Sequence, residues 1–458
     1  MKVIILGAGQ VGYSIARALS LEDNDVCMVD QSPEFLKRMG DAIDIQPIIG
    51  QASYPDVLEK AGAAHADLIV AVTGSDEVNL VACQVAHALF NVKTKIARVR
   101  AQNYLSSSSS ELFVEKHLSI NHIISPEVEI AKTIHRSIGV VGSFNVVSLM
   151  DDAIKAVGLR CPAKAPILNT PLRFLPSSFP QLNFCVLCIT RSDKTFIPDG
   201  DDQIFPQDEV YILVEKNQLQ DVTRALGLHE GEGNDVLIAG GGHIGLALAK
   251  NLETSSHLMC KIIERHQGQA ELAARTLSKT EVLCGDVLDF NVLKEANVSS
   301  VHTMVSVTND DKVNVLAALL AKRQGAQRTM TLLNNADYAS FVSSLGVDAI
   351  INPKSITVST ILQHIRQGRI RGLHAIRGDF AEIIDAEARE TSLAVGIKIG
   401  DMNRSDHILV AILKRNDQLI FMPTPHTLIR INDRLIVLAK KAAVQKVEKL
   451  FSLRAGYL

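Results

Sequence analysis

Three glycines and one acid near the start of the chain have the types and spacing of a phosphate-binding turn. Gly7, Gly9 and Gly12 follow a short apolar run, and a second apolar run ends on Asp30. In such a turn the first glycine permits the tight bend, the second lets a pyrophosphate approach the backbone, and the third lets a helix pack closely on the strand. The N–H groups that open the helix favour phosphate. Asp30 is placed to accept hydrogen bonds from ribose hydroxyls, where its charge disfavours a 2′-phosphate. The pattern predicts a nucleotide site, and a structural glycine turn is the alternative.

The segments that would position these residues alternate between strand and helix patterns. Short apolar runs rich in β-branched residues are typical of buried parallel strands, and apolar residues at helical spacing indicate helices that cover them. The first part of the chain therefore predicts one doubly wound α/β domain. Strands are expected at Lys2–Leu6, Val26–Val29, Pro47–Ile49, Leu68–Val72, Lys95–Val99 and Asn121–Ile124, and helices at Val11–Leu19, Pro33–Met39, Pro55–Ala61, Val78–Leu89, Leu112–Lys116 and Pro126–Ile138, with a loop at the serine run Ser106–Ser110.

Strand patterns dominate from about Val140 to Leu226, which predicts a small α+β module. Cys185 and Cys188 lie three residues apart on one expected strand, where their side chains point to opposite faces, so we expect buried thiols and no metal or redox role. The polar, glycine-rich stretch 227–234 predicts a linker. Strands are expected at Val146–Met150, Phe184–Thr190, Thr195–Ile197 and Glu209–Val214, with a closing helix at Leu219–Leu226.

The pattern then starts again, which predicts two copies of one unit. The glycine motif recurs from Gly240 to Gly245. Glu264 ends a strand as Asp30 does, and it follows Gly240 by nearly the same number of residues as Asp30 follows Gly7. The sequence AVTGSDEVNL, which begins at Ala71, matches SVTNDDKVNV, which begins at Ser306. By the same alignment Gln51 corresponds to Asp286.

A second strand-rich module follows from about Leu373, and its segment from Ile431 to Val437 mirrors PQDEVYILV of the first module. The fold class is therefore α/β, with two doubly wound Rossmann-type domains that are each followed by a small α+β domain. The expected nucleotide-binding domains are 1–138 and 235–370, the expected small domains are 139–226 and 371–458, and 227–234 is the linker.

Polar residues follow the fourth strand of each copy at its carboxyl end, beside the point at which ligands bind in such sheets. They are Thr73 and Gly74 in the first copy and Thr308 and Asn309 in the second. We expect these residues to line the cleft, although the first pair could simply precede a helix that Ser75 or Asp76 caps.

Arg98 lies on an otherwise apolar strand, where a charge is costly unless it is paired. We expect it to bind phosphate or ribose, and an ion pair with a local acid is the alternative. The second copy has Leu332 at this position, so the two sites should differ in affinity or nucleotide preference. Arg265 could partly replace the missing cation, or it could be an ordinary solvated arginine.

Composition and motifs exclude several classes of function. The chain has 458 residues, 47% of them hydrophobic, and a net charge of −3, which gives no basic footprint for nucleic acid. No apolar run approaches the roughly 18 residues that span a bilayer, and no signal peptide is apparent, so we expect a soluble cytoplasmic protein. No residues have the spacing of a metal site or of a nucleophile with its base, so we expect no catalytic or metal-binding residues. Two nucleotide sites without chemistry suggest a sensor.

The whole chain resembles the TrkA family, the regulatory subunits of Trk potassium-uptake systems. The resemblance rests on ILGAGQVG from Ile5, the acid Asp30, ADLIVAVTGSDEVNLVAC from Ala66, IARVR from Ile96 and IISPE from Ile123. Each expected nucleotide domain resembles the N-terminal domain of a regulator of K⁺ conductance (RCK), and each small domain resembles the RCK C-terminal domain.

The resemblance implies a homo-oligomeric ring, expected to be a tetramer, that lies peripherally on the inner face of the membrane against a potassium-translocating subunit of the TrkH or TrkG type. It implies no direct membrane insertion. It also implies NAD as ligand, with ATP and ADP as further effectors. By position it implies a first site of Gly7, Ala8, Gly9, Gln10, Val11, Asp30, Gln51, Thr73, Gly74 and Arg98, and a second site of Gly240, Gly241, Gly242, His243, Ile244, Glu264, Asp286, Thr308, Asn309 and Leu332.

Two alternatives stay open from the sequence. One is a soluble NAD-dependent oxidoreductase, and the other is a regulator of a potassium–proton antiporter with the same domain type. The glycines and Asp30 would contact phosphates and ribose and not nicotinamide, so the sequence does not separate NAD from ATP at either site.

Overall fold

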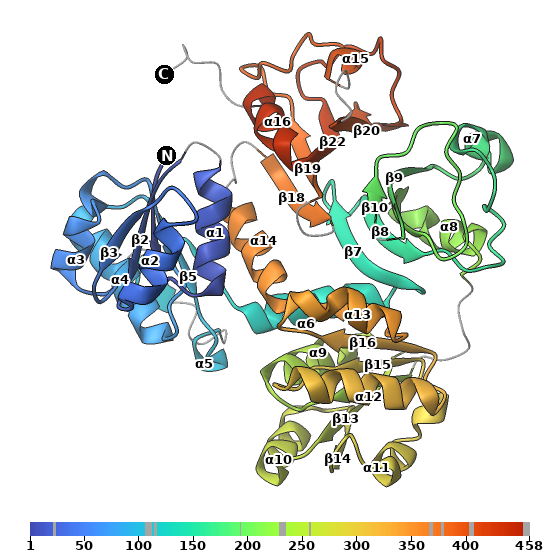
Figure 1. Cartoon of the computed structure of the whole chain (residues 1–458), viewed down its shortest axis with the longest axis horizontal. Coiled ribbons are helices and arrows are strands. Elements are labelled where there is room, and N and C mark those ends of the chain that lie inside the picture. Colours follow the sequence, from blue (N-terminus) through green and yellow to red (C-terminus); the bar gives the residue numbers. More distant parts are fainter. Residues whose placement is uncertain are drawn as a thin grey trace. The chain divides into compact units, whose positions relative to one another are not determined.

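The computed structural model describes residues 1–21, 24–105, 112–113, 117–192, 194–228, 235–255, 258–365, 370–376, 380–402 and 407–451. The chain divides into two units (Figure 1). The first unit contains Met1–Glu129 together with a helix from far along the chain, and the second contains Ile130–Asn352 with the C-terminal part. The expected loop at Ser106–Ser110 and most of the expected linker lie outside the described residues.

The first unit is built on a six-stranded parallel sheet with the strand order β3-β2-β1-β4-β5-β6. This order reverses direction between β1 and β4, which is the switch point where ligands bind in doubly wound sheets. The strands are β1 (Lys2–Leu6), β2 (Asp25–Asp30), β3 (Gln46–Ile49), β4 (Leu68–Ala71), β5 (Thr94–Arg98) and β6 (His122–Ile124), and the helices are α1 (Gln10–Ser20), α2 (Pro33–Gly40), α3 (Pro55–Lys60), α4 (Asp76–Phe90), α5 (Gln102–Leu105) and α6 (Pro126–Ile138).

Helix α14 (Pro353–Ile365) belongs to the first unit although it follows the last strand of the second parallel sheet. It packs against α1, and its buried residues Ile361 and Leu362 join the core that β1 and β2 form with α1 (Figure 1). Most of α6, from Ile130 onward, belongs to the second unit. Each unit thus includes the helix that follows the parallel sheet of the other half.

The second unit contains a parallel sheet with the order β14-β13-β12-β15-β16-β17, which repeats the order of the first sheet. The repeat predicted from sequence is therefore confirmed at the level of topology. The strands are β12 (Asp235–Ala239), β13 (Met259–Glu264), β14 (Glu281–Cys284), β15 (Thr303–Ser306), β16 (Arg328–Leu332) and β17 (Ala349–Ile351), and the helices are α9 (His243–Glu253), α10 (Gln267–Thr276), α11 (Phe290–Glu295), α12 (Asp311–Arg323) and α13 (Ala339–Ser344).

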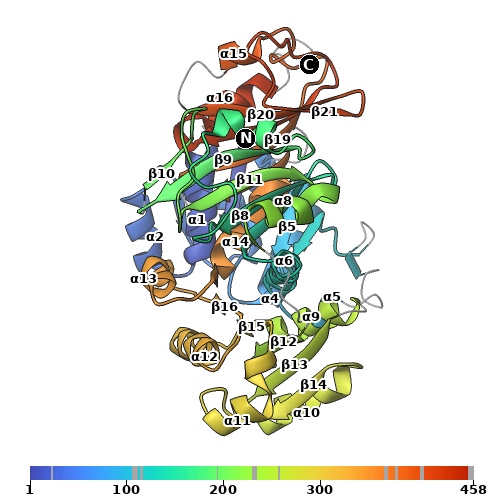
Figure 2. The ribbon, with the colours of Figure 1, turned by 90° about the vertical axis from the view of Figure 1, so that its right-hand side faces the viewer.

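Two five-stranded antiparallel sheets complete the second unit, with the orders β10-β9-β11-β8-β7 and β18-β19-β22-β20-β21. The same topology occurs twice, because the second order repeats the first from the opposite edge. Figure 2 shows β8, β11 and β9 side by side, as their pairing requires. The strands are β7 (Ser143–Leu149), β8 (Ile154–Arg160), β9 (Phe184–Arg191), β10 (Lys194–Phe196), β11 (Glu209–Glu215), β18 (Ile370–Ile376), β19 (Ala381–Glu387), β20 (Ile408–Arg415), β21 (Gln418–Phe421) and β22 (Arg434–Lys440), and the helices are α7 (Leu175–Ser178), α8 (Leu219–Ala225), α15 (Ile399–Met402) and α16 (Val444–Phe451).

A buried carboxylate fixes the turn before the last strand of each antiparallel sheet. Asp208 is 3% exposed and accepts two hydrogen bonds from Arg191, with the Nη2–Oδ2 distance at 2.7 Å. Asp433 is 1% exposed and accepts the same pair of bonds from Arg415. Such bidentate pairs hold a planar geometry as well as a charge. The similarity that the sequence predicted between these two segments therefore reflects an arginine–aspartate pair that both turns share.

The sequence pattern does not predict strand β8. Gly158 interrupts its apolar residues, and glycine is unfavourable in the interior of a strand. Tertiary packing explains the glycine, because a Cβ at this position would overlap the ring of Phe144 on the neighbouring strand β7. No local sequence pattern predicts that contact.

Candidate functional site

The first glycine turn has a backbone that only glycine adopts easily. Gly7 has φ +110°, and a Cβ there would lie 3.0 Å from the backbone of Thr73. A Cβ on Gly12 would overlap the carbonyl oxygen of Gly7, so this position holds α1 against the turn. Gly9 is the N-cap of α1 and is exposed, and no atom lies within 4 Å of its virtual Cβ. The turn is therefore tight on its inner side and open at Gly9.

The carboxylate of Asp30 lies against this turn. Its Oδ2 accepts a hydrogen bond from the Ala8 amide at 2.6 Å, and its Oδ1 accepts one from the Ser32 amide at 2.8 Å. Asp30 is half-buried at the end of β2. Gln51, in the segment after β3, lies nearby because the Gly50 amide donates to the Asp30 carbonyl at 2.9 Å.

A network joins the ends of β4 and β5 in the first unit. The Oδ1 atom of Asn79 accepts from the Thr73 amide at 2.9 Å and from the Thr73 hydroxyl at 2.7 Å, while its Nδ2 donates to the Arg98 carbonyl at 2.9 Å. An Nη2 of Arg98 donates to the Thr73 carbonyl at 2.6 Å. Asn79 is fully buried, and the repeated segment that begins at Ala71 contains it, but the sequence does not predict its role.

Arg98 is a buried cation, as its place on an apolar strand predicted. Its exposed fraction is 8%, and burial lowers its pKa to about 10, helped by the nearby charge of Arg100 and opposed by Glu127 and Asp76. It is therefore charged at neutral pH. Its Nε has no hydrogen-bond partner among the described residues. The Oε1 of Gln51 is also buried without a partner in this part of the chain.

The structure thus brings most of the first set of predicted residues together. A Cβ on Gly7 would meet the backbone of Thr73, Asp30 accepts from the Ala8 amide, and Arg98 donates to the Thr73 carbonyl. The remaining members, by position, are Gln10 and Val11 in the first turn of α1, Gly9 as its N-cap, Gly74 exposed after Thr73, and Gln51 after β3.

The second glycine turn repeats the backbone of the first. Gly240 has φ +108°, and a Cβ on Gly245 would overlap the Gly240 carbonyl oxygen. The Oε2 of Glu264 accepts from the Gly241 amide at 2.7 Å, as Asp30 does from Ala8. Gly242 is the exposed N-cap of α9, which begins at His243 and continues with the half-buried Ile244.

The acid of this second turn is more enclosed. Glu264 is 8% exposed, and its Oε1 accepts from the His266 amide at 2.8 Å and lies 3.1 Å from the His266 ring. Burial opposes ionisation of Glu264, but the bonds from His266 and Gly241 outweigh burial, so the pKa of this carboxyl lies below its ordinary value. Gln269 donates to the Gly241 carbonyl at 2.7 Å. No pattern in the sequence predicts the roles of His266 and Gln269.

The network at the ends of β15 and β16 also repeats, without the cation. Asn314 accepts from the Thr308 amide at 2.8 Å and donates to the Leu332 carbonyl at 3.1 Å. This bond confirms that Leu332, which is 3% exposed, occupies the position of Arg98. Asn309 is exposed, and the exposed Asp286 accepts from the Leu288 amide at 2.9 Å.

A family model described as the TrkA-N domain matches residues 3–126 and 236–353, and one described as the TrkA-C domain matches 384–452. The TrkA-N match falls on both parallel sheets and the TrkA-C match on the second antiparallel sheet, and together they cover more than half of the chain. The chain belongs to the TrkA family.

Relatives in this family match the chain from end to end. A Trk system potassium uptake protein TrkA of Azorhizobium caulinodans is 40% identical over 98% of each chain. The protein of the same name from Vibrio alginolyticus is 35% identical over 98% of each chain. These are names of potassium-uptake proteins and not of enzymes, in agreement with the expectation of a regulatory subunit.

Solved structures show that the fold is that of RCK proteins. The structure titled "Crystal Structure of the GsuK RCK domain" has a TM-score of 0.60 and 16% identity, and the match covers 98% of this chain and 94% of that one. The structure titled "GsuK channel bound to NAD" has the same TM-score, 15% identity and coverage of 98% and 78%. The predicted fold class, two Rossmann-type domains each followed by a small domain, is confirmed.

The described part of this TrkA-family chain contains no helix that is long and apolar enough to cross a membrane. Among the same residues no group of three or more histidine, cysteine or acidic side chains could hold a metal ion. Cys185 and Cys188 are buried and form no disulfide, and burial raises the pKa of Cys185 to about 12.

Proposed function

We propose that this TrkA-family chain is the cytoplasmic, nucleotide-sensing regulatory subunit of a Trk-type potassium-uptake system. The observation that carries the proposal is the paired arrangement of a strained glycine turn, an acid bound to its second amide, and a polar network at the next strand end, present once in each half. The relatives named as Trk system proteins support the transport role.

The first site has the chemistry that a nucleotide needs. The exposed N-terminus of α1 offers backbone N–H groups to phosphate. Arg98 adds a buried positive charge, and its Nε lacks a partner among the described residues, as does Oε1 of Gln51. Buried polar atoms of this kind usually have a partner, so a bound ligand would complete the site. The residues present therefore fit NAD, with ATP and ADP as further ligands.

Within this proposal, Asp30 accepts from ribose hydroxyls, Arg98 contacts phosphate, and Thr73 with Gly74 borders the cleft. In the second site, Glu264 takes the role of Asp30, and Leu332 provides an apolar wall in place of the cation. The remaining residues proposed to line the two clefts are those at the glycine turns with Gln51, Asp286, Thr308 and Asn309.

Binding would act on transport by shifting the shape of a homo-oligomeric ring against a membrane subunit of the TrkH or TrkG type. Moving a gate from 1:99 to 99:1 needs about 5.5 kcal/mol of differential affinity. One extra charge-assisted hydrogen bond supplies roughly 1.5–3 kcal/mol. A single site is therefore too weak, and several coupled sites suffice, which gives a physical reason for duplication and for a tetrameric ring that closes by hinge motion.

The test combines binding with transport. Calorimetric titration of the purified chain with NAD should show binding, and a potassium flux through vesicles that contain the membrane subunit should change when chain and nucleotide are both added. Turnover of NADH with a small substrate would instead support an oxidoreductase. Co-purification with a potassium–proton antiporter alone would support the other alternative. Absence of nucleotide binding would contradict the proposal altogether.

A further inference from the structure

Two histidine rings stack where helix α14 meets the first parallel sheet. His122 is the first residue of β6, and His364 lies in the last turn of α14. Their ring centroids are 4.4 Å apart, with an interplanar angle of 30°. Both side chains are half-buried, and both elements belong to the first unit. The ring pair is therefore part of the contact by which α14 packs on this unit.

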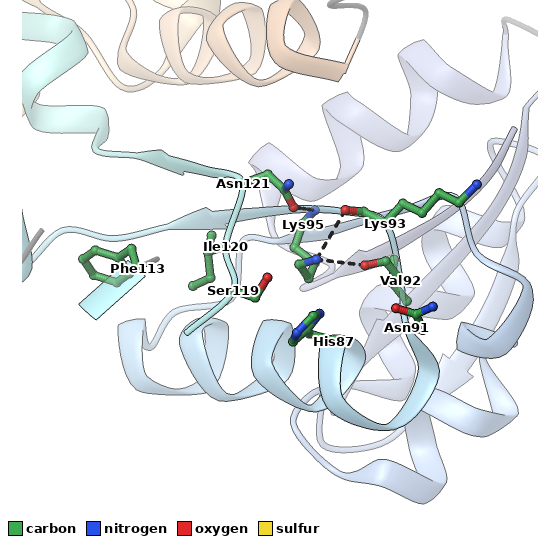
Figure 3. A pocket seen from close by; sticks show the side chains of 9 residues that line it. All are labelled: His87, Asn91, Val92, Lys93, Lys95, Phe113, Ser119, Ile120 and Asn121. Carbon is green, nitrogen blue, oxygen red and sulfur yellow. Dashed lines mark hydrogen bonds between the residues drawn. The ribbon is translucent and has the colours of Figure 1, made fainter. Parts of the chain in front are cut away.

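The backbone holds His122 in place on the sheet. The amide of Lys95 donates to Oδ1 of Asn121 at 2.8 Å (Figure 3), and the Asn121 amide donates to the Lys95 carbonyl at 3.0 Å. His122 is the next residue along the chain and pairs with Ile96 of β5. If the two rings separate, we therefore expect α14 or the His122 side chain to move, and not the strand.

The second unit holds the corresponding helix by a different group. Helices α6 and α14 both begin with proline and have 13 residues, which makes Ser137 the counterpart of His364. The Ser137 carbonyl accepts from Nη1 of Arg328 at 2.9 Å. Burial lowers the pKa of Arg328 to about 10, so this guanidinium stays charged near neutral pH. Strand β17 begins with Ala349, where β6 begins with His122.

A proton on His122 is unfavourable while the rings are stacked. His122 and Ile124 lie on the same face of β6, and Ile124 belongs to the core that also contains Ile361 and Leu362 of α14. A charge beside such apolar side chains is costly. Burial, and after it the nearby His364 ring, lower the pKa of His122 below its ordinary value of 6.5. Because burial is the larger cause, this cost remains whatever else His364 binds.

The elements that meet at the ring pair carry mostly positive side chains. Within their bounds α1, β5, β6 and α14 contain no aspartate or glutamate, and the acids that follow β6 lie in the first turn of α6. A proton on either ring therefore adds to positive charge on these four elements. Besides the two histidines, the titratable side chains of these elements and of that first turn are Tyr13, Arg17, Lys95, Arg98, Glu127, Glu129 and Lys354.

We propose that the stacked pair of His122 and His364 is a pH-sensitive contact that holds α14 on the first unit and loosens as the pH falls. Protonation favours the arrangement in which the His122 ring reaches water. The packed arrangement is therefore favoured above about pH 6.5 and loses stability as the pH falls below that value.

Helix α14 follows the last strand of the second parallel sheet, so a looser helix weakens a link between the two halves of the chain. Nucleotide-dependent regulation would then respond to the pH around the protein. This influence on potassium uptake rests on the proposed function, whereas the contact itself does not.

Hydrogen exchange of the full chain, corrected for the effect of pH on the chemical exchange rate, tests the contact. Between about pH 8 and about pH 5.5, exchange of the α14 amides should become about three- to tenfold faster, because protons then bind the loosened form more tightly. The amides of α6 provide the internal control, since Arg328 holds the end of that helix and keeps its charge over this range. Unchanged exchange in α14, or an equal increase in α6, would overturn the proposal.

The decisive variant is His122→Phe, which keeps a ring at this position and removes the titration. Its α14 amides should exchange at the same corrected rate at both pH values, and His364→Phe should behave alike. His65→Gln, at an exposed histidine of the same unit, is the matched control and should keep the acid response. An acid response in His122→Phe equal to that of the wild type would also contradict the proposal.

Potassium flux through vesicles that contain the membrane subunit tests the regulatory consequence. The response of flux to pH should be smaller with His122→Phe than with the wild type, and equal responses would rule out a regulatory role for the contact. Failure of NAD to bind at about pH 8 would contradict the proposed function and leave the exchange result unaffected. The two failures are therefore distinguishable.

Discussion

The two glycine turns have the same backbone but different surroundings for the acid. In the first turn Asp30 is half-buried, and the residues that correspond to His266 and Gln269 are Ser32 and Phe35, the latter 47% exposed. In the second turn Glu264 is 8% exposed and its Oε1 also lies 3.1 Å from the His266 ring, while Gln269 donates to the Gly241 carbonyl. The first turn is thus open and the second is partly closed by its own side chains.

The side chain at the end of the fifth strand also differs in charge between the two parallel sheets. The buried guanidinium of Arg98 in the first sheet corresponds to the buried side chain of Leu332 in the second. A buried cation favours a ligand in proportion to the negative charge it carries. Duplication has therefore preserved the backbone and the acid, which position a sugar, and changed the groups that respond to phosphate charge.

The largest expected effect tests whether the shared backbone is essential to both halves. In Gly12→Ala and Gly245→Ala the added methyl would overlap the carbonyl oxygen at the start of the turn. Relief requires moving the helix away from the strand, so each variant should lose about 3 kcal/mol or more of unfolding free energy. Denaturant unfolding measures this loss. Gly9→Ala, where nothing lies within 4 Å, is the matched control for the first turn. Equal losses at Gly9 and Gly12 would contradict the packing explanation.

A second effect compares the two acids. Asp30→Ala should weaken nucleotide binding at the first site about 10- to 100-fold, because a charged hydrogen bond contributes roughly 1.5–3 kcal/mol. Glu264→Ala should do the same at the second site. Calorimetry on each variant, with the other site disabled by its own alanine substitution, separates the two. Unchanged affinity in Asp30→Ala would rule out the ribose role.

The sequence was sufficient to predict the six strands of the first parallel sheet in their order along the chain, because most of them are continuous apolar runs, but it did not predict helix α5. Helix Pro126–Ile138 begins and ends where it was expected, and β5 begins one residue earlier than predicted. The sequence also predicted that Leu332 stands in the second copy where Arg98 stands in the first. Equivalent hydrogen bonds from Asn79 and Asn314 confirm this correspondence. These features depend on local periodicity and on the internal repeat.

The remainder depends on contacts that no local pattern encodes. The glycine in β8 is explained only by the ring of Phe144, and the placement of α14 in the first unit depends on Ile361 and Leu362 finding the core beside α1. His266 and Gln269 close the second turn through single hydrogen bonds from exposed or half-buried side chains. Such bonds have no characteristic spacing, so the sequence did not distinguish the open turn from the closed one.

A third, smaller effect tests the charge difference between the sites. Arg98→Leu makes the first site resemble the second, and it should lower affinity for ATP more than for adenosine, by about tenfold for one charged hydrogen bond. Equilibrium dialysis with both ligands gives the ratio. Asn79 still holds the network through backbone atoms, so the fold should persist. Equal losses for adenosine and ATP would show that Arg98 does not act on phosphate.

The smallest expected effect concerns the contribution of the Glu264 carboxylate to the stability of the fold. The pKa of Glu264 is depressed in the folded chain, so its ionised form stabilises the fold at pH values above the ordinary carboxyl pKa of 4.5, and this contribution is lost as the pH falls below that value. Glu264→Gln removes the charge but keeps the shape. The difference in unfolding free energy between wild type and variant should therefore be present at pH 7 and shrink as the pH falls from about 5 to 3.5. Thermal unfolding across this range, with Glu253→Gln as a second carboxyl whose pKa is also lowered, measures the difference. If the difference in unfolding free energy between the wild type and Glu264→Gln stays constant with pH, then the shape of this side chain, and not its charge, stabilises the second turn.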